Sequence, residues 1–116
     1  NYWSNALYTS YFLSLYNWFY YCGTVNITSN VPSTRTRSIY INGELHLSNS
    51  QSNGFIGYGP ITIGALFGSN LFQGGLDEFR IYSRTLTVDE IRQLYQNIYC
   101  NNDRLEIYYR FDVIGG

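Results

Sequence analysis

The sequence predicts an all-β fold, an antiparallel β-sandwich of the jelly-roll type with one short helix near residues 87–98. Apolar and polar residues alternate with a period of two over most of the chain, and turn-forming residues separate the alternating segments. A helical period appears once, late in the sequence. The sequence lacks the alternating strand and helix units that predict a parallel sheet. With 116 residues, the chain is expected to form one domain, residues 1–116, with a single core.

The first strands are predicted before residue 30. Residues 11–16 are a short candidate, and residues 18–28 place apolar side chains on both sides of a longer strand. Both faces of that strand are therefore expected to be at least partly covered. Residues 29–38, SNVPSTRTRS, contain a proline and many hydroxyl side chains without an apolar period, which predicts a loop.

The segment SIYINGELHL is the clearest hairpin signal. Ile39 and Ile41 share one face of the first arm, and Leu45 and Leu47 follow on the second arm. Between the arms, Asn42–Gly43 can adopt the positive φ angles of a type I′ turn, whose twist matches that of antiparallel strands.

The second half of the chain begins with a glycine-rich segment, residues 48–60, which predicts a loop. A short strand is predicted in residues 61–63 and another in residues 74–84, GGLDEFRIYSR.

The period then changes to that of an amphipathic helix. Thr87 can accept a hydrogen bond from the backbone amide of Glu90 while the Glu90 side chain reaches back, forming a capping box. Four apolar residues follow at helical spacing, namely Ile91, Leu94, Tyr95 and Ile98. After this helix, residues 105–113 alternate again and predict a final strand.

Charge excludes several classes of partner. The formal net charge is -1, and all seven basic residues are Arg, dispersed along the chain. Nucleic acids and anionic membranes are disfavoured, because both require clustered positive charge. The longest apolar run, Trp18 to Cys22, is too short to span a bilayer. Since the sequence contains no Met, it is expected to be a processed chain or an excerpt, and a secretion signal could precede it.

Cys22 and Cys100 match no zinc or CxxC redox spacing. A disulfide between them is predicted, and two free buried thiols are the alternative. Asn26-Ile27-Thr28 is an acceptor sequence for N-glycosylation at Asn26. Together with the Ser-, Thr-, Asn- and Tyr-rich composition that lacks Lys, it predicts an extracellular, secreted glycoprotein.

With these elements in place, the sequence resembles the laminin G-like, concanavalin A-like lectin/glucanase superfamily of jelly rolls. The matching segments are YNWFYYCGTVN, IYINGEL, ITIGA and FQGGLDEFRIYSRTLTVDEIRQLY, within residues 16–95. The sequence departs from the family at both ends. Few residues precede the Trp-led strand, and LEIYYRFDVIGG, similar to the family's opening strand, comes last. The domain is therefore expected to be short at its N-terminus.

Catalysis is not expected. Asp77 and Glu78 are adjacent in a predicted strand, so their side chains point to opposite faces and cannot act together on one bond. A structural role is expected instead, through hydrogen bonds to the backbone or pairing with Arg80 or Arg84. The glucanases of the resembling superfamily carry carboxylates alternating along one strand, and this sequence contains no such string. The single histidine, His46, cannot form a metal site alone.

The sequence contains more aromatic residues than one small core should need, with thirteen Tyr. Exposed rings could form a binding surface for sugar or protein, and Tyr40, Tyr58 and Tyr108 are the candidates for carbohydrate binding. No cofactor or metal site is predicted. Calcium is possible, because some relatives bind it, and Asp77 and residues 101–103 are its only candidate ligands.

The leading hypothesis is a non-catalytic extracellular structural or adhesive module that self-assembles head-to-tail into filaments. A sandwich without part of its leading edge exposes unpaired backbone groups, which the last strand of a neighbouring copy can pair with. The residues expected to be exchanged are Leu105, Ile107, Tyr109, Phe111 and Val113. The alternative is a lectin-like carbohydrate-binding module, and a fragment of a polysaccharide hydrolase has less support. Expected partners are other copies of the chain and glycans.

Overall fold

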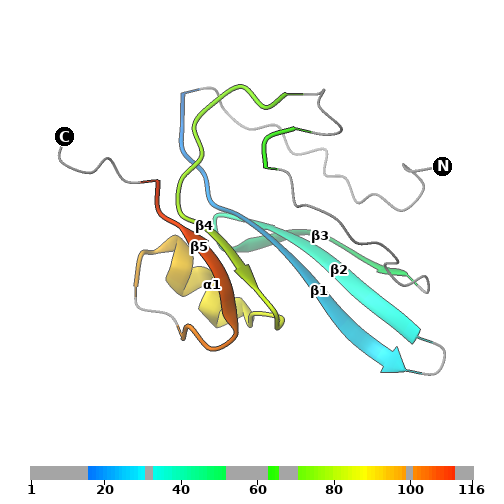
Figure 1. Ribbon diagram of the computed structural model, residues 1–116. Coiled ribbons are helices and arrows are strands. Elements are labelled where there is room, and N and C mark those ends of the chain that lie inside the picture. The colour runs from blue at the N-terminus through cyan, green and yellow to red at the C-terminus, as the bar shows by residue number, and fades with distance from the viewer. Residues whose placement is uncertain (1–15, 31–32, 52–62, 66–70, 99–100, 112–116) are drawn as a thin grey trace. The chain divides into compact units, whose positions relative to one another are not determined.

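The computed structural model describes residues 16–30, 33–51, 63–65, 71–98 and 101–111 (Figure 1). These residues form strands and one helix in the order β1, β2, β3, β4, α1 and β5. Every strand pair is antiparallel, which confirms the predicted all-β class with one short helix. The chain divides into two compact units. The first contains residues 1–54 and 84–103, and the second contains residues 55–83 and 104–116.

The first unit contains a three-stranded sheet in the order β1 (Tyr21–Asn30), β2 (Ser33–Ile41) and β3 (Glu44–Gln51). The turn between β2 and β3 has φ angles of 53° at Asn42 and 79° at Gly43. Positive φ at both positions is what a type I′ turn requires, and the predicted hairpin is confirmed. Beyond the turn, His46 forms a bulge, because Ile39 pairs with Leu47 and Tyr40 pairs with Leu45.

The predicted loop at residues 29–38 is wrong. β1 continues to Asn30, and β2 begins at Ser33 and lies between β1 and β3. Thr-Arg-Thr-Arg alternates with a period of two, although its residues are polar, and a central strand is hydrogen-bonded on both sides. Pairing with β1 and β3 therefore stabilises β2 as a strand, although its residues lack an apolar pattern. The predicted loop at residues 48–60 also begins later, since β3 extends to Gln51 and residues 52–60 lie outside the described part.

One face of this sheet is covered unevenly. Ile39 and Ile41 lie on the same side of β2 and are only 5% and 3% exposed, whereas Val25 and Ile27, on the same side of β1, are 54% and 56% exposed. The face is therefore buried along the turn-side half of β2 and open along β1, where Tyr21, which pairs with Ile41, is 58% exposed.

Helix α1 (Val88–Tyr95) also belongs to the first unit, and its predicted capping box between Thr87 and Glu90 is confirmed. Ile91 is fully buried. The helix is shorter than the predicted 87–98, because Gln96 forms the C-cap and Asn97 has a φ of 58°. It lies against the β2–β3 turn, since a Cβ placed on Gly43 would stand 3.2 Å from Cγ of Arg92.

The second unit contains a two-stranded ribbon of β4 (Phe79–Tyr82) and β5 (Leu105–Tyr109) (Figure 1). β4 is shorter than the strand predicted for residues 74–84. Ile63, predicted to be in a strand, lies in a bend, and residues 61–62 are outside the described part. Most of the predicted strand at residues 11–16 is also outside it.

The predicted last strand is confirmed over Leu105–Tyr109, but its partner differs from the expectation. It pairs with β4 of the same chain, so the edge of residues 105–109 that faces β4 needs no neighbouring copy. Phe111 lies beyond the strand and has a φ of 57°, and Val113 is outside the described part. Strand exchange between copies stays a prediction.

Within the part of the chain that the structure describes, no helix has the length and apolar character needed to cross a membrane.

Candidate functional site

A cluster of polar and aromatic side chains lies on one face of the β4–β5 ribbon. It consists of Glu78, Arg80 and Tyr108, and we call it the Tyr108 cluster. Nη2 of Arg80 donates to Oε2 of Glu78 over 3.1 Å and to the hydroxyl of Tyr108 over 2.9 Å. The Tyr108 hydroxyl in turn donates to the same Glu78 oxygen. The guanidinium carbon of Arg80 lies 4.2 Å from the centre of the Tyr108 ring, at cation–π distance.

Strand register and one unusual backbone angle bring these residues together. Arg80 and Tyr108 are directly opposite one another in the β4–β5 ladder, so their side chains share a face. Glu78 precedes β4 and has a φ of 52°, and its amide donates to Oδ1 of Asp77 over 2.8 Å. The carboxylates of Asp77 and Glu78 thus take the structural roles expected from the sequence, although they lie before the strand and not within it.

The electrostatics of the cluster favour binding over nucleophilic chemistry. The hydrogen bond to the Glu78 carboxylate raises the pKa of Tyr108 above its ordinary value, so the phenol stays protonated and acts as a donor. The ion pair of Arg80 with Glu78 holds the guanidinium over the ring. The three side chains therefore form a fixed group, in which the Tyr108 residue remains 38% exposed.

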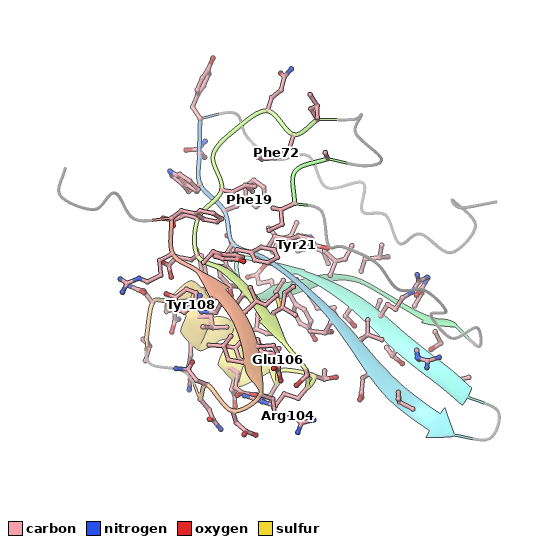
Figure 2. All side chains as sticks on the ribbon, in the orientation of Figure 1. Phe19, Tyr21, Phe72, Arg104, Glu106 and Tyr108 are labelled. Atoms are coloured by element: carbon pink, nitrogen blue, oxygen red, sulfur yellow. The ribbon has the colours of Figure 1, made fainter. Side chains whose placement is uncertain are left out.

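A second carboxylate lies next along β5. Oε1 of Glu106 accepts a hydrogen bond of 2.7 Å from the hydroxyl of Ser83, whose amide donates to the carbonyl of Arg104. Glu106 is two residues before Tyr108 on β5 and forms a bulge, because Ile81 pairs with Ile107 and Tyr82 pairs with Leu105 (Figure 2). The ribbon thus offers fixed acceptors and an aromatic ring, a combination suited to a ligand with many hydroxyl groups and an apolar ring face.

The other aromatic candidates are placed differently. Tyr40 is half-buried in the central strand β2 of the first unit, and Tyr58 lies outside the described residues. Asn26, the predicted glycosylation residue, is exposed on β1 opposite Thr36, and its glycosylation stays a prediction.

Cys22 is a free thiol, so the structure does not show the predicted disulfide to Cys100, which is outside the described part. Burial raises the pKa of the Cys22 thiol to about 11. A thiol with this pKa is protonated at neutral pH, and the disulfide to Cys100 stays a prediction.

In the described ranges, no three His, Cys, Asp or Glu residues are grouped closely enough to hold a metal ion. The proposed calcium ligands make local contacts instead. Oδ1 of Asp77 accepts from the amide of Glu78, and Oδ1 of Asn101 accepts from the amide of Asp103 over 2.9 Å. Calcium binding therefore stays a prediction.

Sequence reasoning missed the two arginines of β2, Arg35 and Arg37, because it placed them in a loop. Both lie on the same face of the central strand as Val25 and Ile27 of β1, to which they are paired across the ladder. The signal that could have found them is the strict alternation of Thr and Arg in residues 34–37.

Comparison with known proteins identifies the fold family. Residues 1–92 match the Laminin G type of the concanavalin A-like lectin/glucanases superfamily. The chain belongs to this superfamily, as its Asn-Gly hairpin and capped helix indicated, and its antiparallel sheets agree with the all-β class of that superfamily.

One similar solved structure is an S-layer domain-containing protein (residues 221–444) from Clostridium thermocellum, with 25% sequence identity and a TM-score of 0.49. The match covers 75% of this chain and 43% of that one, so this chain spans less than half of the solved structure. A comparison with curated proteins gives no match.

Proposed function

We propose that this chain is a non-catalytic extracellular module that binds carbohydrate through the Tyr108 cluster. The observation that carries the proposal is the exposed Tyr108 ring, held by Arg80 and Glu78 through hydrogen bonds and a cation–π contact. Membership of a superfamily that includes lectins supports it.

The binding mode follows from the geometry of the cluster. A sugar ring stacks its C–H face on the exposed part of Tyr108 and directs its hydroxyl groups to the carboxylates of Glu78 and Glu106. Because Arg80 and Ser83 already hold these acceptors, little side-chain entropy is lost on binding. By binding glycans on another surface, such a module would also act in adhesion. Its extracellular location is supported by the exposed acceptor residue Asn26 and the Lys-free composition.

The proposal is tested by a glycan array probed with the full chain, with and without calcium. Tyr108→Ala is expected to lower affinity for the bound glycans about tenfold or more, because the stacking ring and a donor are both lost. Tyr95→Ala, which removes an exposed ring from α1, is the matched control and is expected to bind like the original chain. An array without hits, or equal binding by both variants, contradicts the proposal.

The two other hypotheses have less support. Hydrolysis of a polysaccharide needs two carboxyl groups converging on one bond, whereas here Glu78 is engaged by Arg80 and Tyr108, and Glu106 by Ser83. Turnover of a glucan or galactan by the chain would establish the hydrolase hypothesis. Self-assembly by strand exchange is weakened by the pairing of β5 with β4 and is decided by the mass of the chain in solution.

A further inference from the structure

Two loop segments of the second unit expose apolar side chains. The first is residues 63–65, and the second is residues 71–76, which lead toward β4. The exposed apolar residues of these segments are Ile63 (38%), Leu71 (70%), Phe72 (50%) and Leu76 (47%). We call these four side chains the apolar loop patch. None of them belongs to the Tyr108 cluster.

The two segments are held together by direct contacts. The amide of Phe72 donates to the carbonyl of Gly64 over 2.8 Å. A Cβ on Gly64 would stand 3.9 Å from both Cδ1 of Leu76 and Cβ of Phe72, so these two side chains lie beside the glycine. The ring of Phe72, which is labelled in Figure 2, lies against Gly74, where a Cβ would stand 3.1 Å from the ring. The patch is therefore one surface built from both segments.

The patch lies in a part of the sequence that carries no charge. No Asp, Glu, Lys, Arg or His occurs from residue 47 to residue 76. The next charged residues are Asp77 and Glu78, which directly precede β4, and Glu78 is paired with Arg80. Moving the four apolar side chains out of water therefore removes no charged group of their own segments from water, which is the costly step for most protein surfaces.

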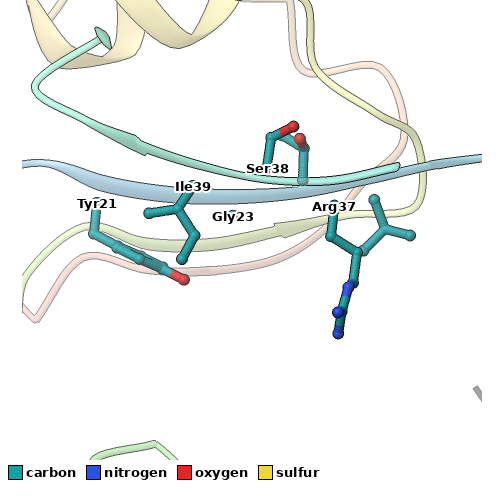
Figure 3. A pocket seen from close by; sticks show the side chains of 7 residues that line it. Tyr21, Gly23, Arg37, Ser38 and Ile39 are labelled. Carbon is teal, nitrogen blue, oxygen red and sulfur yellow. The ribbon is translucent and has the colours of Figure 1, made fainter. Parts of the chain in front are cut away.

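Exposed apolar residues of the first unit differ, because charged groups lie beside them. Tyr21 lines a hollow of about 160 Å³ together with Arg37 (Figure 3). On helix α1, the exposed Val88 is followed directly by Asp89. Contact of either region with an apolar phase would take a charge out of water, so neither region has the neutral character of the apolar loop patch.

The size of the patch favours a lipid surface over a folded protein as its partner. Four side chains with these exposed fractions present roughly a few hundred Å² of apolar surface. A stable protein interface buries roughly 800 Å² on each partner, so the patch alone is too small to form one. A bilayer needs no complementary shape, and binding at its interface grows with the apolar area that is buried.

We propose that the apolar loop patch is a peripheral contact for the interface of a zwitterionic or uncharged lipid bilayer. Leu71 and Phe72, the two most exposed residues of the patch, enter the headgroup region, and the carboxylate of Asp77 stays in water. Because this carboxylate is the nearest unpaired charge in the sequence, anionic headgroups are disfavoured. The contact does not span the bilayer, and it does not depend on carbohydrate binding by the Tyr108 cluster.

The test is flotation of the full chain with vesicles of pure phosphatidylcholine, which carry no sugar. The chain is expected to float with the vesicles, equally at low and high salt, because the contact is not electrostatic. Leu71→Asp is expected to weaken partitioning about tenfold, since a carboxylate replaces an apolar side chain at the interface. Ile98→Asp places the same charge at a 55% exposed aliphatic residue of the first unit and is the control, with unchanged binding expected. Circular dichroism checks that both variants fold.

Several results would overturn the proposal. Absence of flotation with phosphatidylcholine would remove the lipid contact, and flotation only after phosphatidylserine is added would assign binding to the arginines of the chain. Equal loss for Leu71→Asp and Ile98→Asp would show that added negative charge matters and the patch does not. Self-association that Leu71→Asp abolishes, without vesicle binding, would assign the patch to a second copy. Loss of flotation in Tyr108→Ala would place the lipid contact at the Tyr108 cluster instead.

Discussion

At the scale of single residues, Arg84 joins two segments of the first unit through several hydrogen bonds. Its guanidinium donates to both oxygens of Glu90, over 2.8 and 2.7 Å, and to the carbonyls of Asn101 and Asp103. Glu90 also accepts from the amide of Thr87 as part of the capping box. One ion pair thus ties the start of α1 to the segment that follows the helix.

This ion pair predicts a pH dependence of stability. The Arg84 hydrogen bonds lower the pKa of Glu90 from 4.5 to about 2. Because the folded value is the lower one, the stabilisation is complete above pH 4.5 and is lost as the pH falls from 4.5 toward 2. Glu90→Gln, measured by urea denaturation, is expected to cost about 1 kcal/mol at pH 7, and the difference from the original chain should shrink through this window. Asp89→Asn, in the same helical turn, is the control; a difference for Glu90→Gln that is independent of pH would contradict the assignment.

At the scale of elements, the β2–β3 hairpin and helix α1 depend on one another. Asn42 accepts a hydrogen bond from the amide of Tyr20 through Oδ1 and donates its own amide to the Tyr20 carbonyl, both over 2.8 Å. The rings of Tyr20 and Tyr95 are 6.5 Å apart, and Thr85 donates to the carbonyl of Val25 over 2.6 Å. The turn, the start of β1 and the helix therefore form a single contact region.

Gly43→Ala is expected to loosen this region. A Cβ at Gly43 would be strained at a φ of 79° and would also stand 3.2 Å from Cγ of Arg92 and 3.5 Å from Cδ2 of Tyr95. The left-handed conformation alone costs a non-glycine residue roughly 1–2 kcal/mol, and the displaced helix adds to that. Urea denaturation should show at least this loss, while Gly75→Ala, at an exposed position without a positive φ, should change stability little. An unchanged midpoint for Gly43→Ala would mean that the helix does not lie on the turn.

The elements that could be predicted from the sequence are those whose signals are local. The Asn42–Gly43 turn and the capping box of Thr87 and Glu90 each lie within a few residues, and both are confirmed. β2 was missed because its residues are polar and its stability comes from two neighbouring strands, which no local pattern reveals. The Tyr108 cluster was predicted only as separate residues. Its assembly depends on the pairing of Arg80 with Tyr108, 28 positions later, and on the positive φ of Glu78.

At the scale of the whole molecule, the proposed carbohydrate site lies within one of the two compact units. The three-stranded sheet and helix α1 belong to the first unit, and the Tyr108 cluster belongs entirely to the second. The cluster is built across two antiparallel strands, because Arg80 of β4 is paired with Tyr108 of β5. Its residues can therefore be substituted without changing a residue of the first unit.

The state of association in solution decides between glycan binding by single copies and assembly by strand exchange. Because residues 105–109 pair with β4 of their own chain, the full chain is expected to be a monomer by sedimentation velocity. A chain truncated after residue 103 exposes the edge of β4, and a synthetic peptide of residues 104–113 is expected to bind it in a one-to-one complex. The same peptide should not bind the full chain, in which β5 already occupies that edge. A full chain that forms multimers, together with a truncated chain that stays monomeric, would instead show that the last strand is donated to a neighbour.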